Sequence, residues 1–218
     1  MNPSFRTTER LVWGGLALVV AVIVAAFIHS RRQPAPAELA PFPVIGPVAG
    51  FSLTNQDGAA VSRETLQGHV WIADIIFTRC PGPCARMTGQ MKELQTALPA
   101  TSGARLVSLT TDAGFDTPPV LKKYAGRFGA RLDNWMFLTG DPRAIANLAI
   151  DSLKLTALEK PAAERTSPED LFVHSTIFVA VDKRGQLRAV FETGGEGVDW
   201  QESKQKILTA VEQLEREP

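Results

Sequence analysis

Apolar and polar residues follow one another through the middle of the chain in a pattern that predicts alternating strands and helices. The predicted strands are the apolar runs at 70–77, 106–109 and 135–138. Helical patterns lie between and after them, at 118–128 and 142–153. A further helix is expected after the first strand, because Met87, Met91, Leu94 and Leu98 fall on one helical face. Such alternation is typical of an α/β protein with a layered sheet.

The last third of the chain has a different pattern, which predicts a hairpin and a final helix. Strand-like runs at 175–181 and 186–191 are separated by residues 182–185, a sequence suited to a tight turn. Residues 200–214 carry an apolar stripe at helical spacing, so this helix is expected to cover one face of the sheet. The polar stretch 154–171 predicts a long loop. These elements predict a thioredoxin-like sheet with flanking helices, closed by a C-terminal β-hairpin plus helix.

The N-terminal region predicts one transmembrane helix ahead of this domain. Residues 11–28 contain no charged side chain and would span about 27 Å as a helix, close to the thickness of a bilayer core. A cleaved signal peptide is the alternative, because Ala35-Pro36-Ala37 is rich in small residues. The expected organisation is an N-terminal tail at 1–10, a transmembrane anchor at 11–28, a Pro/Ala-rich linker at 29–50 and the thioredoxin-like domain at 51–218.

Composition and charge narrow the choice of partner. The chain has 218 residues, 44% of them hydrophobic, which is enough to bury one core. Lys and Arg together number 23, as do Asp and Glu, so the formal net charge is zero. No basic excess is available to neutralise a phosphate backbone, and a nucleic-acid partner is therefore not expected.

The two cysteines of the chain are the first candidates for chemistry. Cys80 and Cys84 lie directly after the strand predicted at 70–77 and before a helix. Pro83 suits the first turn of that helix, where unsatisfied backbone N–H groups favour a thiolate over a thiol. We therefore expect a reactive, redox-active pair, with an inert disulfide as the alternative.

The three histidines lie in different surroundings. His29 adjoins the predicted anchor, and His69 is expected at an exposed strand end. His174 ends the long polar loop, at a place that faces the cysteines in a thioredoxin-like sheet. Two thiolates and one imidazole suit Cu(I), and with an open position also Cu(II), whereas structural zinc would require a fourth ligand. Packing of the loop is the alternative role for His174.

Other side chains near the cysteines have simpler interpretations. Met87 and Met91 are expected to fill the core, because they share a helical face with leucines. Asp116 and Thr117 precede Pro118, and one or the other is expected to cap a helix. The loop that contains Asp112 and Asp116 leaves the predicted sheet on the same edge as the cysteines, so a supporting role near the site is the alternative.

In these motifs the chain resembles the Sco/SenC family, and the resemblance covers about residues 51–214. The segment 77–84 matches the motif F-T-x-C-P-x-x-C, and 112–118 matches D-x-x-x-D-T-P. The segment Trp135-Met136-Phe137-Leu138-Thr139-Gly140 and a histidine before a closing hairpin also fit. The chain departs from many members in having Ala85 after the second cysteine and Gly82-Pro83 between the cysteines.

The resemblance implies a membrane-anchored, thioredoxin-fold copper metallochaperone with Cys80, Cys84 and His174 as copper ligands. It implies delivery of Cu(I) or Cu(II) to a copper-accepting protein, such as the cytochrome oxidase subunit that holds the binuclear copper centre. The alternative is a thiol-disulfide oxidoreductase that reduces the cysteines of a copper-site partner and is itself served by thioredoxin-like reductants. Either role is expected in a single-pass inner (cytoplasmic) membrane protein with its C-terminal domain outside the cytoplasm.

Overall fold

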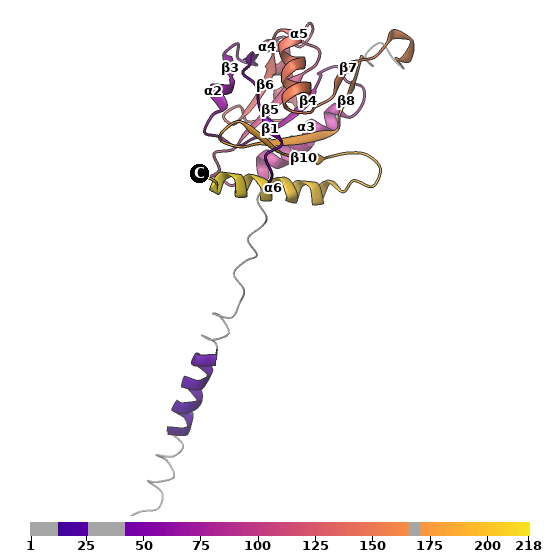
Figure 1. The fold of residues 1–218 in the computed structure, drawn as a ribbon. Helices are drawn as coiled ribbons and strands as arrows, with labels where there is room; N and C mark the ends of the chain where they lie inside the picture. The colour runs from indigo at the N-terminus through magenta and orange to yellow at the C-terminus, as the bar shows by residue number, and fades with distance from the viewer. Residues whose placement is uncertain (1–12, 26–41, 166–170) are drawn as a thin grey trace, which may run out of the picture. The chain divides into compact units, whose positions relative to one another are not determined.

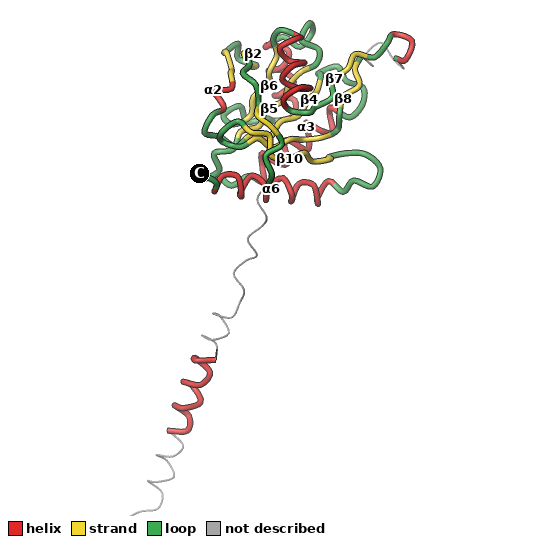
Figure 2. The backbone as a smooth tube through the Cα atoms, viewed as in Figure 1, coloured by secondary structure: helices red, strands yellow, loops and turns green. Residues whose placement is uncertain are grey.

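Eight strands form one sheet in the order β1-β10-β9-β4-β5-β6-β2-β3 in the computed structural model, which describes residues 13–25, 42–165 and 171–218 (Figure 1). The strands are β1 (Gly46–Pro47), β2 (Ser52–Asn55), β3 (Ala60–Ser62), β4 (Trp71–Ile76), β5 (Arg105–Thr110), β6 (Trp135–Thr139), β9 (Ile177–Val181) and β10 (Gln186–Glu192). The central strands β4, β5 and β6 are parallel, and β9 and β10 run antiparallel to their neighbours. Figure 2 shows these strands with helices on either side.

Helices cover both faces of the sheet and bury two separate apolar clusters. The helices are α2 (Arg63–Leu66), α3 (Cys84–Ala97), α4 (Pro118–Arg127), α5 (Pro142–Ala146), the π-helix Asn147–Ser152 that continues α5, and α6 (Trp200–Arg216). On one face, α3, α4 and α6 pack against side chains that include Ile72 and Ile76 of β4. On the other, α2 and α5 pack against Trp71, Ala73 and Ile75. Alternate residues of β4 therefore face opposite layers, as the pleat of a strand requires.

The predicted elements of the central domain are confirmed. The apolar runs become β4, β5 and β6, the amphipathic runs become α3, α4 and α5 with its π-helical continuation, and the last third forms the hairpin β9–β10 followed by α6. Met87 and Met91 are fully buried in the cluster beneath α3, as their spacing predicted. Sequence periodicity thus identified the elements that carry most of the buried apolar surface.

The segment at 154–171 contains secondary structure that the sequence did not predict. A second, two-stranded sheet pairs β7 (Ala157–Glu159) with β8 (Phe172–His174), and a 3₁₀ turn at Ala162–Glu164 lies between these strands. Three-residue strands are too short to show an apolar alternation. The expectation of an irregular loop was therefore wrong for these residues.

The residues just before the predicted domain also belong to the sheet. Contacts define Pro41–Pro218 as one compact unit. Ile45 N donates to Leu187 O, and Val48 N donates to Gly185 O, which pairs β1 with β10. The domain therefore extends into the segment predicted as linker, because a two-residue strand that contains a proline gives no strand pattern of its own.

The predicted anchor is only partly within the described residues. Residues 13–25 are helical, whereas 1–12 and 26–41, which include the tail, both ends of the anchor, His29 and most of the linker, lie outside the described residues. Across the described ranges, no helix combines the length and the apolar character needed to cross a bilayer.

Candidate metal centre

Topology brings three loops to one edge of the sheet. The cysteine loop, residues 77–83, follows β4, and the aspartate loop, residues 111–117, follows β5. Parallel neighbours end at the same edge, so the two loops lie side by side. Strand β9 runs antiparallel beside β4, which places the residues before β9, at 174–176, at this edge as well. The predicted site residues therefore come from segments that meet in space.

The two cysteines differ in exposure. Cys84 is the first residue of α3 and is only 1% exposed, whereas Cys80 is half-buried in the loop. The backbone N–H of Gly82 lies 3.4 Å from Cys80 Sγ and donates to it. Neither cysteine is in a disulfide in this structure. Because Cys80 is the more accessible sulfur, it is the group that an incoming metal or disulfide meets first.

The expected low pKa at the helix N-terminus is not found at Cys84. The pKa of this thiol is raised, first by its hydrogen bond with Cys80, then by burial, and further by the charges of Cys80 and Asp74. The prediction that the helix terminus makes both sulfurs more acidic was therefore wrong for Cys84. Burial and a neighbouring sulfur outweigh the partial charge at the helix end, so the folded environment favours the thiol form of Cys84 over the thiolate.

A buried carboxyl group lies in the same layer as Cys84. Asp74 is fully buried on β4 and follows Ile72 on the face that packs against α3. Its registered neighbour on β5 is Ser108, which accepts a hydrogen bond from Trp135 Nε1 at 3.1 Å. Sequence reasoning missed Asp74, although a charged residue inside an apolar strand was a visible signal.

Asp116 holds the cysteine loop to the end of β5. Its fully buried carboxylate accepts from Thr78 N at 3.0 Å, and both the Thr78 and the Thr110 hydroxyls donate to it. Thr78 is only two residues before Cys80. The aspartate loop therefore fixes the start of the cysteine loop, and burial raises the pKa of Asp116 against the effect of these hydrogen bonds.

This arrangement corrects the prediction that Asp116 or Thr117 caps α4 through its side chain. Thr117 is the N-cap residue by backbone position, but its side chain makes no capping hydrogen bond. The Asp116 carboxylate points to Thr78 and Thr110 instead. The alternative, a supporting role at the cysteines, is the one the structure favours.

A second contact between the same two loops lies nearer the surface. The Arg79 guanidinium donates to Asp112 Oδ2, with distances of 3.1 Å from Nε and 2.5 Å from Nη2. The same group stacks over the ring of Phe115, 4.1 Å from its centroid. The two aspartates of the D-x-x-x-D-T-P motif thus bind the two residues that precede Cys80.

The structure describes His69 and the backbone of His174. The backbone of His174 ends β8 opposite Ala157, close in sequence to β9, and its side chain lies outside the described part of the structure. His69 Nδ1 lies 2.8 Å from Gly103 O, a strand-end contact that confirms its structural role. Within the described residues, no three His, Cys, Asp or Glu side chains form a group that could hold a metal ion. A three-ligand site therefore depends on where the His174 imidazole lies.

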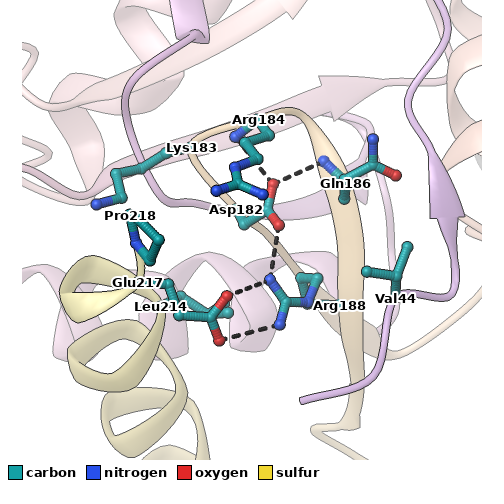
Figure 3. Close-up of a pocket in the computed structure, with 9 residues that line it drawn as sticks. All are labelled: Val44, Asp182, Lys183, Arg184, Gln186, Arg188, Leu214, Glu217 and Pro218. Atoms are coloured by element: carbon teal, nitrogen blue, oxygen red, sulfur yellow. Dashed lines mark hydrogen bonds and ion pairs between the residues drawn. The ribbon is translucent and has the colours of Figure 1, made fainter. Parts of the chain in front are cut away.

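A cavity of about 410 Å³ lies at the opposite end of the sheet (Figure 3). Its walls come from the β9–β10 turn, the end of α6 and Val44. Val181, at the end of β9, pairs with Trp71, the first residue of β4, so this cavity is far along the strand from the cysteine loop. Within it, Arg188 pairs with Asp182 and Glu217. The cavity is separate from the candidate metal centre.

A family profile, a sequence relative and a solved structure all relate this chain to the same family. The SCO1/SenC family profile matches residues 46–211. The SCO1 protein homolog of Bacillus subtilis (strain 168) is 39% identical over 142 residues, which cover 64% of this chain and 70% of the relative. A similar solved structure is that of BsSco, a member of the Sco family of cytochrome c oxidase assembly proteins in which a disulfide switch has been identified. The two structures superpose with a TM-score of 0.67 at 31% sequence identity, and the match covers 82% of this chain and 99% of BsSco.

A copper-bound structure shares the fold. Bradyrhizobium japonicum ScoI with copper bound gives a TM-score of 0.61 at 24% identity, covering 77% of this chain and 99% of ScoI. The family profile alone spans well over half of the chain, and the matched range includes the cysteine loop, the aspartate loop and His174. The chain belongs to the SCO1/SenC family.

Proposed function

We propose that this chain binds copper through Cys80, Cys84 and His174 and delivers it to a copper-accepting protein. The observation that carries the proposal is the cysteine pair at the carboxyl end of β4, held there by Asp116 and next in space to the segment that ends in His174. Membership of the SCO1/SenC family supports it, as does copper in the structure of a member with the same fold.

The donor set suits copper in both oxidation states. Two thiolates satisfy Cu(I), which prefers soft ligands and low coordination numbers, whereas Cu(II) gains from the added imidazole. Binding releases the thiol protons, since the thiolate is the ligand. Cys80 is the accessible sulfur, so a ligand of the acceptor protein can approach the metal from its side and displace the donors one at a time.

The acceptor we propose is the cytochrome oxidase subunit that holds the binuclear copper centre. BsSco belongs to a family of cytochrome c oxidase assembly proteins, which supports this choice. Free copper is not required at any stage if the metal passes directly between donor and acceptor ligands. The reaction is then an exchange of ligands, with no net change in the oxidation state of copper.

Copper binding by the full-length chain, purified in detergent and reduced without oxygen, tests the ligand set. We expect one copper per chain and, with Cu(II), a thiolate charge-transfer band. Cys80→Ser and Cys84→Ser should abolish this band. His174→Ala should weaken Cu(II) binding by more than the roughly 100-fold that loss of a supporting partner costs. His69→Ala is the matched control, because the His69 imidazole lies against Gly103 O just before β4, at the end of that strand away from the cysteine loop, and this variant should bind copper as the wild type does.

A thiol-disulfide oxidoreductase is the second candidate, and the unequal exposure of the two cysteines favours it. Cys80, the more accessible of the two, would attack a partner disulfide as a thiolate, and Cys84 would then resolve the mixed disulfide by forming the Cys80–Cys84 bond. Two electrons and two protons pass to the partner, and a thioredoxin-like reductant would restore the pair. Absence of stoichiometric copper of either valence in the experiment above would contradict the chaperone and leave this reaction as the function.

We further propose that residues 11–28 tether the domain to the inner membrane, with the domain outside the cytoplasm. The proposal rests on the absence of charge along this segment. The full-length chain is expected to stay in the membrane pellet after extraction with alkaline carbonate, and a chain that begins at Pro41 to appear in the supernatant. Release of the full-length chain would contradict the anchor, and a shortened N-terminus in cells would indicate a cleaved signal peptide.

A further inference from the structure

The segment that follows His174 is fastened to the end of β10 by three hydrogen bonds. The Thr193 backbone N–H donates to Thr176 O at 2.9 Å, and the Thr193 hydroxyl donates to the same oxygen at 2.7 Å. The Thr176 hydroxyl in turn donates to Gly194 O at 3.0 Å. Thr176 is two residues after His174, so these bonds set the position of the backbone on which the histidine lies.

Thr193, the residue directly after β10, is also bound by the cysteine helix. Gln90 Nε2 donates to Thr193 O at 2.8 Å, and both side chains are nearly inaccessible, at 5% and 2% exposed. Gln90 belongs to α3, the helix that begins with Cys84. A continuous path of hydrogen bonds therefore runs from α3 through Thr193 to Thr176.

A second contact brings α3 against this loop. Arg86, two residues after Cys84, lies directly over Gly194, and a Cβ added at Gly194 would stand 2.2 Å from Arg86 Nη2. Glycine at this position leaves room for the guanidinium where it lies, and a larger residue would require Arg86 to move. The helix that begins with Cys84 thus touches the Thr193–Gly194 loop at two places.

We propose that Thr193, together with Gln90, is a positioning residue that sets the His174 segment at a fixed separation from the cysteine helix. The inference rests on the proposed function, in which His174 is a copper ligand. Between β8 and β9 the histidine segment bonds to Thr156 through Ser175 and to Thr193 through Thr176. Together these contacts restrict the conformations from which the imidazole can reach the metal, and the Thr193 contacts are the ones that connect the segment to the cysteine helix. Cu(II), which uses the imidazole, depends on this restriction, whereas Cu(I) bound by two thiolates does not.

The test compares Thr193→Val with Thr193→Ser and Thr96→Val in the full-length chain in detergent. Valine keeps the shape of threonine and removes its hydroxyl, and serine restores the hydroxyl. Thr96 is exposed, and its hydroxyl donates to Lys92 O within α3. We expect Thr193→Val to weaken Cu(II) binding about 10-fold, in the range found for supporting partners of metal ligands. The nitrogen hyperfine coupling in the EPR spectrum should weaken as well, while Cu(I) affinity stays unchanged. Thr193→Ser and Thr96→Val should match the wild type.

Gln90→Met provides a second variant that removes the donor to Thr193 O from the helix side, and it should produce the same selective loss. A lowered melting temperature with unchanged Cu(II) affinity and EPR spectrum in both variants would overturn the inference, as would equal losses for Cu(I) and Cu(II). The His174→Ala variant distinguishes a failure of the ligand assignment from a failure of the positioning role. If that variant binds Cu(II) as the wild type does, the ligand assignment itself fails. If it does not and the Thr193 and Gln90 variants do, only the positioning role fails.

Discussion

Replacing Asp116 by alanine is expected to destabilise the domain by about 3 kcal/mol and to free the cysteine loop. The change leaves the Thr78 backbone N–H and the hydroxyls of Thr78 and Thr110 without their acceptor at a buried position. An unsatisfied buried donor costs about 1–3 kcal/mol, and relief of the buried charge offsets part of the sum. Urea unfolding gives the loss of stability, and the rate at which Cys80 and Cys84 form a disulfide reports the freedom of the loop.

Asp133→Ala is the matched control, because Asp133 is exposed and its ion pair with Arg131 spans 3.7 Å. It should change stability by less than about 0.5 kcal/mol. Asp116→Asn retains one acceptor oxygen and is expected to lose less than alanine does. Equal stabilities for the Asp116→Ala and Asp133→Ala variants would show that Asp116 does not hold the loop.

The pH dependence of the Asp116 variants has a definite sign. Burial raises the pKa of Asp116 above its ordinary value of 3.8, so the folded state favours the protonated form. The resulting stabilisation is complete below pH 3.8 and is lost as the pH rises through the raised pKa. The stability difference between wild type and Asp116→Asn should therefore be largest in acid and shrink toward neutral pH. A difference that grows with pH would contradict this.

The cysteine loop could be predicted from sequence because all its determinants are local. A strongly apolar strand, two cysteines and helix-starting Pro83 follow one another within fifteen residues, from Val70 to Cys84. The roles of Asp116 and Thr193 could not be predicted in the same way. Their partners, Thr78 and Thr176, are distant in sequence and become neighbours only when β4, β5, β9 and β10 assemble. The register between the strands determines which of these residues meet, and this register could not be predicted from the sequence.

The raised pKa of Cys84 shows a different limit of the sequence. The local rule for a helix N-terminus favours a thiolate, yet the outcome depends on how deeply α3 is buried and on the side chains opposite it. Cys80 opposes the ionisation of Cys84 first through its hydrogen bond, and Asp74 opposes it through its charge. The local sequence therefore predicts that this loop offers two cysteine sulfurs, but the pKa of Cys84 depends on how deeply the folded protein buries it.

Arg188→Met is expected to destabilise the domain by about 3 kcal/mol. Arg188 is 7% exposed, donates to Asp182 Oδ2 at 2.7 Å and to both oxygens of Glu217, and reaches Phe42 O at 2.6 Å (Figure 3). It therefore joins the N-terminal segment, the β9–β10 turn and the end of the chain. Removing one member of a buried ionic group leaves the others uncompensated and costs about 3–5 kcal/mol, with the low end expected because Glu217 can turn to water.

The local consequence of Arg188→Met should appear in the N-terminal segment before the rest of the domain. Hydrogen exchange at the Ile45 amide, which donates to Leu187 O, should accelerate, whereas the Gln186 amide keeps its bond to Asp182 Oδ1. Arg216→Met is the control, because the exposed Arg216 pairs only with Glu212 one turn away on α6, and it should cost less than about 0.5 kcal/mol. Uniform acceleration across the sheet, or equal losses in the two variants, would show that Arg188 does not specifically hold residues 42–48 to the domain.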